Sequence, residues 1–122
     1  MSWTFQQSTG ALTAPDGTLV GHGYSGNGPD LDNPAAQGVI DHGPIPQGGW
    51  IIGTFADRPV VGEFAAPLTP CEDTDTLGRS GFYVHGDNPA MDHTASDGCV
   101  VLLRPLREAI AISGDRLLRV VP

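Results

Sequence analysis

Two segments decide how this chain folds: Gly81-Phe82-Tyr83-Val84-His85-Gly86 and Ser96-Asp97-Gly98-Cys99-Val100-Val101-Leu102. Each contains an apolar run rich in aromatic or β-branched side chains, which is typical of a buried strand. A histidine ends the first run, and a cysteine begins the second. We therefore expect strands over 81–85 and 99–103 that let His85 and Cys99 meet across a sheet, with the polar loop between them lying above the pair.

Glycine and proline divide the rest of the chain into short apolar runs. There are 17 Gly and 11 Pro among 122 residues, and they fall between apolar stretches, which favours a loop-rich β domain over disorder. Pro15-Asp16-Gly17 is a strong hairpin signal, because Asp-Gly suits a tight turn. We expect further strands over 50–55 and 116–121, and long loops over 25–37 and 67–79.

One helix is expected, over Arg104–Ile112. Pro105 suits the first helical turn, apolar residues follow at helical spacing as far as Ile110, and Gly114 ends the helix. The sequence thus predicts a single domain over residues 1–122. Its fold class is mostly β, a sandwich or barrel with one short C-terminal helix.

Charge and hydropathy exclude several classes of partner. The formal net charge is −8, and all six cationic side chains are arginines, so there is no basic stripe for nucleic acid or for an anionic membrane surface. No apolar run approaches the roughly 18 residues that a membrane-spanning helix needs. Residues 1–7 lack the basic start and the apolar stretch of a secretory signal peptide. We expect no nucleic acid partner, no membrane partner and no signal peptide.

The two strand ends carry a nucleophile and a base. A thiol attacks well only as a thiolate, so it needs a base such as His85 nearby. Gly98 permits a tight turn that could aim backbone N–H groups at a developing oxyanion, and Ser96 and Asp97 could orient the imidazole or contact substrate. Taken singly, Cys99 could instead be a small buried hydrophobe, and Asp97-Gly98 merely a hairpin turn.

Several motifs resemble a known family of enzymes. The His-Gly pair at 85–86, followed by Ser-x-Gly-Cys at 96–99, is similar to the signature of YkuD-like L,D-transpeptidases. A closer resemblance is to the type VI secretion L,D-transpeptidase effector family (Tlde-like domain). It is carried by Ser8-Thr9-Gly10-Ala11-Leu12, Gly23-Tyr24-Ser25-Gly26-Asn27-Gly28, Gly43-Pro44-Ile45-Pro46-Gln47-Gly48 and Gly78-Arg79-Ser80-Gly81-Phe82. The resemblance spans most of the chain and implies the L,D-transpeptidase catalytic fold.

The resemblance also implies an activity and its residues. Members of the family cleave or exchange the terminal D-alanine next to meso-diaminopimelate in peptidoglycan tetrapeptide stems, as L,D-carboxypeptidases or L,D-transpeptidases without a cofactor or metal. By position, Cys99 matches the acylated nucleophile and His85 its base, and Ser96 and Gly98 match the motif positions before the nucleophile. The residues expected to bind substrate are Gly86, Arg79, Asp97 and His93.

Two positions depart from the YkuD-like pattern. Those enzymes usually carry Arg two places after the cysteine, where this chain has Val101. Either Arg104 or Arg79 substitutes for it, or the substrate carboxylate is bound differently. Asp97 stands where histidine is commoner, so the role of that histidine is absent or passes to His93, which is also a rival to His85 as the base.

The second cysteine is expected to be dispensable. Cys71 lies in a loop with Glu72, Asp73 and Asp75, whose negative charges disfavour a thiolate. A Cys71–Cys99 disulfide is the competing structural interpretation, and it would abolish activity.

Two other classes of function stay open at this point. One is a metal-stabilised domain that uses His85, His93, Cys99 and Cys71, although the C-x-x-C and H-x-x-x-H spacings of zinc sites are missing. The other is a catalytically inactive module that binds the cell wall.

The missing signal peptide conflicts with a substrate that lies outside the inner membrane. The effector resemblance fits this mismatch: the protein would be made in the cytoplasm, delivered by a type VI system and active in the periplasm of target bacteria. A cytosolic enzyme that acts on recycled wall fragments would lack the signal as well, so the mismatch alone does not decide. Peptidoglycan stem peptides are then its substrate, and a cognate immunity protein and a component of the secretion apparatus are its implied partners.

Overall fold

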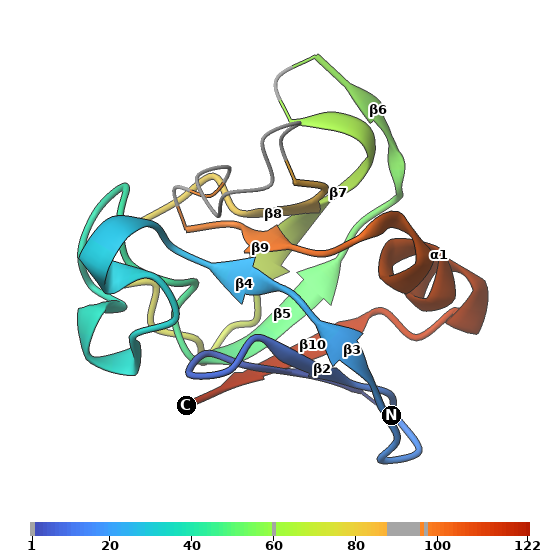
Figure 1. The fold of residues 1–122 in the computed structure, drawn as a ribbon, viewed down its shortest axis with the longest axis horizontal. Helices are drawn as coiled ribbons and strands as arrows, with labels where there is room; N and C mark the ends of the chain where they lie inside the picture. The colour runs from blue at the N-terminus through green and yellow to red at the C-terminus, as the bar shows by residue number, and fades with distance from the viewer. Residues whose placement is uncertain (1, 60, 88–95, 97) are drawn as a thin grey trace.

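The computed structural model describes residues 2–59, 61–87, 96 and 98–122. Within them the chain is mostly β, with one α-helix (Figure 1). In chain order the elements are β1 (Trp3–Gln6), β2 (Ala11–Thr13), β3 (Leu19–His22), β4 (Tyr24–Ser25), the 3₁₀ turns η1 (Gly28–Asp30) and η2 (Pro34–Ala36), β5 (Gly48–Ile52), β6 (Ala56–Arg58), β7 (Gly62–Pro70), β8 (Tyr83–His85), β9 (Val100–Val101), α1 (Arg104–Ser113) and β10 (Leu117–Val121).

The strands form one mixed sheet in the order β3-β2-β1-β10-β5-β7-β8-β9-β4, with β6 paired to β7. The pairs β1–β10 and β8–β9 are parallel, and the others are antiparallel. The two ends of this order, β3 and β4, follow each other in the chain, so the sheet curls back on itself around its core (Figure 1). This is the small sandwich-like β domain that the sequence predicts.

Two glycines make the bend between β3 and β4 possible. A Cβ atom on Gly23 would lie 1.9 Å from the carbonyl oxygen of Val101, and one on Gly10 would lie 1.8 Å from the carbonyl oxygen of Gly23. The Gly23 N–H donates to the Gly10 carbonyl at 2.8 Å. The backbones therefore pass in direct contact, which no residue with a side chain allows. Both glycines belong to the segments that carry the family resemblance.

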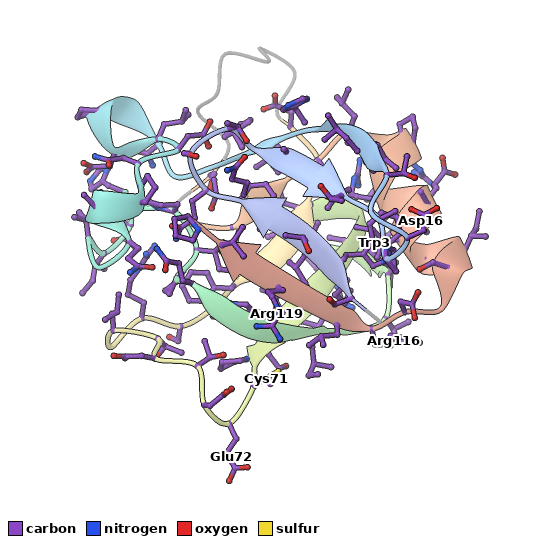
Figure 2. The ribbon with its side chains drawn as sticks, turned by 90° about the horizontal axis from the view of Figure 1, so that it is seen from below. Trp3, Asp16, Cys71, Glu72, Arg116 and Arg119 are labelled. Carbon is purple, nitrogen blue, oxygen red and sulfur yellow. The ribbon has the colours of Figure 1, made fainter. Side chains whose placement is uncertain are left out.

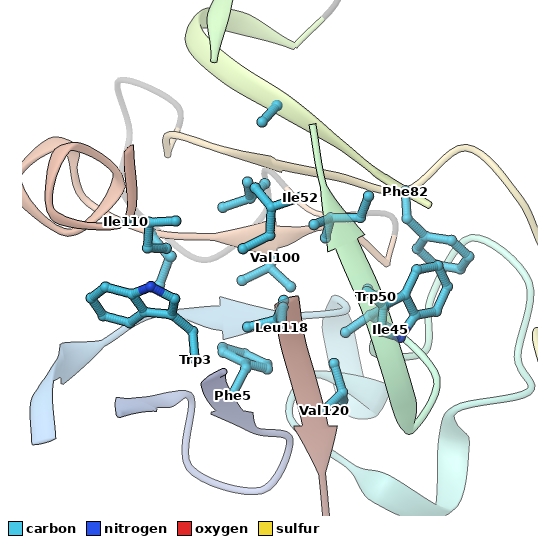
Figure 3. Packing of buried hydrophobic residues seen from close by; sticks show 14 of the residues in the cluster. Trp3, Phe5, Ile45, Trp50, Ile52, Phe82, Val100, Ile110, Leu118 and Val120 are labelled. Atoms are coloured by element: carbon cyan, nitrogen blue, oxygen red, sulfur yellow. The ribbon is translucent and has the colours of Figure 1, made fainter. Parts of the chain in front are cut away.

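The core lies between the two halves of the curled sheet (Figure 3). Phe5 on β1 and Leu118 on β10 face Val100 on β9 across it. At one end Trp50 meets Phe82 edge to face, with ring centroids 5.0 Å apart. The strands that will carry the candidate site are thus fixed from behind by apolar packing, since Val84 and Val100 are both buried in this cluster.

Helix α1 follows the expected signals closely. It spans Arg104–Ser113, with Pro105 in its first turn and Gly114 closing it in the left-handed conformation at φ +74°. Ile110 is buried in the core, and Leu106 packs against the core from its edge. The predicted helix and the Pro15-Asp16-Gly17 hairpin between β2 and β3 are both confirmed.

The loop expected over 67–79 is wrong for its first four residues, because β7 runs from Gly62 through Pro70. Pro67 pairs in register with Tyr83, and Pro70 with Trp50. Proline lacks an N–H but keeps its carbonyl, and the Pro67 carbonyl accepts a hydrogen bond from the Gly53 N–H at 2.8 Å. Gly53 therefore supplies the donor of this contact, and Pro67 takes part in the sheet through its carbonyl. The loop expected over 25–37 also contains η1 and η2.

Two neighbouring isoleucines on β5, one buried and one exposed, allow a test of which residues form the core. Ile52 is 2% exposed, whereas Ile51 is 44% exposed. We expect Ile52→Ala to lower the free energy of unfolding by about 2–5 kcal/mol, because it removes a buried side chain and leaves a cavity. Ile51→Ala, the matched control, should cost less than about 1 kcal/mol. Urea denaturation measures both, and equal losses would contradict the assignment.

Candidate active site

His85 and Cys99 lie on neighbouring parallel strands. His85 is the last residue of β8 and pairs in register with Val101 of β9, while Cys99 directly precedes β9. Cys99 is two residues before Val101, so both cysteine and histidine side chains leave the same face of the two strands. Strand spacing and rise put their Cα atoms roughly 8 Å apart. Both residues that the sequence singled out thus lie at the β8–β9 pair.

Main-chain groups surround the thiol. The Tyr83 N–H donates to Cys99 Sγ over 3.3 Å, and Sγ lies 3.8 Å from the carbonyl oxygen of Gly81. An N–H directed at sulfur stabilises negative charge there. The Gly81 carbonyl accepts from the protonated thiol, so the two main-chain contacts fix the position of Sγ in both forms.

The imidazole is oriented by the residue that follows it. His85 is 6% exposed, and its Nδ1 lies 2.7 Å from the carbonyl oxygen of Gly86. A carbonyl can only accept, so Nδ1 must carry the proton in this contact. In the neutral ring the basic nitrogen is then Nε2, as a general base needs. Gly86, expected at the substrate, thus contacts the histidine through its backbone.

Ser96 is buried under the nucleophile. Its side chain is fully buried, and its hydroxyl donates to the Cys99 carbonyl at 2.7 Å. The same oxygen accepts the N–H groups of Gly98 and Gly26, each at 3.0 Å. The Gly98 N–H is therefore bonded to Ser96. These contacts give Ser96 a positioning role.

The segment from Tyr24 to Asn27 holds the turn from the other side. The Ser25 hydroxyl donates to the Gly98 carbonyl at 3.0 Å and accepts the Ile45 N–H at 2.8 Å. Asn27 Nδ2 donates to the Ser96 carbonyl at 2.7 Å. In the sequence, Ser25 and Asn27 were noted only as part of a motif. Small polar residues next to glycines are nevertheless typical of a segment whose side chains bind backbone groups.

Tyr24 reaches the far end of β8. Its hydroxyl donates to Asp87 Oδ1 at 2.7 Å, and Tyr24 itself pairs with Val101 across β4 and β9. Asp87 follows directly after His85-Gly86. This bond therefore ties the segment after the histidine to the strand that flanks the cysteine.

The arginine predicted at the substrate has a different set of contacts. Arg79 is 7% exposed and donates to the carbonyl oxygens of Gln37, Gly43 and Pro44. Its guanidinium also lies over the Phe82 ring. The other candidate, Arg104, is exposed at the start of α1 between Glu63 and Glu108. The contacts of Arg79 thus join it to the 37–44 segment of the protein.

The remaining sequence predictions fall in three places. Asp97 and His93 lie outside the described residues. No disulfide joins Cys71 to Cys99. Cys71 follows β7 and packs against Gly49 of β5, and Figure 2 shows it beside Glu72.

Within the described ranges, no three His, Cys, Asp or Glu side chains gather as metal ligands. None of the helices in that part of the chain has the length and apolar character to cross a bilayer.

Because of its buried contacts, Ser96 should contribute more to the free energy of unfolding than a serine on the surface. Ser96→Ala leaves two buried N–H groups and the Cys99 carbonyl without this partner, so the free energy of unfolding should fall by about 2–4 kcal/mol. Ser80→Ala, at an exposed position, is the control and should change it by less than about 0.5 kcal/mol. Thermal or urea unfolding of both variants measures the difference, and a Ser96→Ala protein as stable as Ser80→Ala would refute the role.

Comparison with known families agrees with this geometry. The sequence matches the Tlde1 domain family over residues 20–117, a range that contains β3 to α1 and both His85 and Cys99. No curated protein matches the chain. The family implies a type VI secretion effector with L,D-transpeptidase-like activity, a peptidoglycan substrate and action in the periplasm of the target cell. The chain belongs to the Tlde1 domain family, as its motifs indicated.

Proposed function

We propose that the protein is a cysteine enzyme that cuts or exchanges the terminal D-alanine of peptidoglycan tetrapeptide stems, with Cys99 as nucleophile and His85 as base. The observation that carries the proposal is the pair of parallel strands that puts a thiol and an oriented imidazole on one face. A merely structural cysteine would not need an N–H directed at its sulfur, as Cys99 has from Tyr83.

Acylation would proceed by general base and then general acid catalysis. His85 Nε2 takes the proton from Cys99 Sγ, and the thiolate attacks the carbonyl carbon that joins diaminopimelate to D-alanine. When the tetrahedral intermediate collapses, the C–N bond breaks and the imidazolium gives its proton to the departing amine. A thioester between Cys99 and the tripeptide stem remains. The Gly86 carbonyl keeps the ring in one tautomer and stabilises its cationic form.

The fate of the thioester decides between the two activities. Water, deprotonated by His85, gives a tripeptide stem and the free thiol, which is the L,D-carboxypeptidase reaction. The amine of a D-amino acid gives an exchanged stem, which is the L,D-transpeptidase reaction. Both acceptors use the same base, so one site supports both outcomes.

The two cysteines provide a matched test of the nucleophile. Cys99→Ala should abolish turnover of purified muropeptides, because no other group at the site can form the thioester, and its melting temperature should stay close to that of the wild type. Cys71→Ser should keep most of the activity, because Cys71 packs against Gly49 away from His85. Mass spectrometry of the muropeptides gives the readout. Activity that persists in Cys99→Ala, or disappears in Cys71→Ser, would overturn the assignment.

Delivery into a periplasm is the second part of the proposal. A type VI effector is delivered from outside the target cell, where an immunity protein and a component of the secretion apparatus are its expected partners. Because peptidoglycan lies beyond the inner membrane, the protein should act only on that side.

Expression in a Gram-negative host tests this location. Without a leader peptide the protein should be harmless, and with a fused secretory leader it should swell or lyse the cells. The leader-fused Cys99→Ala variant is the control and should be harmless, since it is exported but cannot form the thioester. Growth and microscopy measure the effect. Equal growth with and without the leader, in cells shown to export active enzyme, would argue against the toxin function.

A further inference from the structure

A buried arginine cation lies directly against the turn that carries the proposed nucleophile. A Cβ atom on Gly98 would lie 2.2 Å from Nη2 of Arg79, so the guanidinium occupies the space where any side chain at position 98 would go. Gly98 has φ +125°, a backbone conformation that also favours glycine. Gly98 therefore leaves the space that the Arg79 side chain fills. Cys99 is the next residue in the chain.

Backbone oxygens of the 37–44 segment hold the guanidinium. It donates to the carbonyls of Gly43 at 2.9 Å and of Pro44 at 2.7 Å, and it also donates to Gln37. Phe82 covers one face of the group, with its centroid 5.1 Å from the Arg79 Cζ atom. Arginine suits this place, because its planar fork can serve several acceptors at once, which lysine cannot do.

Charge adds a second link between Arg79 and the nucleophile. Burial lowers the pKa of Arg79, and the negative charges of Asp41 and Cys99 oppose that effect. An arginine stays protonated at neutral pH even when its pKa falls. Because the attraction between two groups is mutual, a cation that is stabilised by a Cys99 thiolate stabilises that thiolate equally.

We propose that Arg79 is a positioning residue that holds the Gly98–Cys99 turn against the 37–44 segment and favours the thiolate form of Cys99. The proposal rests on the proposed role of Cys99 as nucleophile. It assigns Arg79 to the nucleophile rather than to a substrate carboxylate. The other described titratable groups near this face are His85, Tyr83 and Asp87 from β8 and its end, Tyr24 from β4, Asp41 beside Arg79, Arg58 over the Tyr83 ring and Arg107 beside Gly86.

The test measures the reactivity of Cys99 against pH. In a Cys71→Ser background Cys99 is the one remaining thiol, and intact-mass spectrometry follows its alkylation by iodoacetamide. Arg79→Gln keeps amide donors but removes the charge, so the pH midpoint of alkylation should move upward and the rate at pH 7 should fall about tenfold. Arg79→Lys keeps the charge without the fork, so its midpoint should move less than that of Arg79→Gln.

Two further variants supply controls. Arg119→Gln makes the same change of charge at an exposed position on β10 (Figure 2), and its midpoint should match that of the parent protein. Asp41→Asn removes a negative charge from an exposed loop position, so it should move the midpoint slightly downward. Because that shift would arise directly from the Asp41 charge, Arg79→Lys is the variant that keeps the proposal testable if Arg79→Gln fails to fold: loss of the fork should still raise the midpoint above that of the parent protein.

The outcomes separate this inference from the function on which it rests. A folded Arg79→Gln protein with an unchanged midpoint would overturn the role of Arg79, and so would an Arg79→Lys protein with the midpoint of the parent if Arg79→Gln does not fold. If Cys99 of the parent protein reacts no faster at pH 7 than an ordinary free thiol, the proposed nucleophile itself is wrong, whatever the variants do.

Discussion

The buried Ser96 hydroxyl is the contact on which the shape of the candidate site depends. One oxygen donates to the carbonyl of Cys99 and accepts the N–H groups of Gly98 and Gly26. A buried polar group without a partner is costly, so these bonds allow little freedom once the surrounding segments have packed. The turn before the nucleophile therefore takes its conformation from the residues after β4, which lie about seventy positions earlier in the chain.

The two faces of the β8–β9 strand pair have different roles, one in the core and one in the candidate site. Val84 and Val100 point into the apolar core, while Tyr83, His85 and Cys99 leave the opposite face of the same strand pair. Close packing from behind restricts the strands to small movements. The relative position of His85 and Cys99 thus depends on the packing of Val84 and Val100 in the core. A substitution in the core near β8 or β9 should disturb the site without touching it, because the alternation of side chains couples the two faces.

Electrostatics at the site differ from those of the whole molecule. The chain carries a net charge of −8, which would disfavour a thiolate on its surface. Among the described residues, however, the buried cation of Arg79 and the dipole of the Tyr83 N–H lie near Cys99. Fields of this kind act over a few ångströms in a medium of low dielectric constant, so they outweigh distant surface charges that water and salt screen.

The amino-acid sequence by itself determined the fold class, helix α1 and the hairpin at Pro15-Asp16-Gly17. It also indicated that a strand ending in histidine lies beside a strand that follows a cysteine. These features follow from periodicity, capping and turn chemistry over a few residues. It did not reveal that β7 continues through Pro67 to Pro70, because proline has no N–H for a strand ladder and locally indicates a loop. Nor did it show that Ser96 binds backbone groups or that Arg79 faces Gly98. Those roles exist only when segments around residues 25, 43, 79 and 98 meet, and contacts between residues so distant in the chain leave no local pattern. Tertiary packing alone decides them, because it sets which buried polar atoms must find one another.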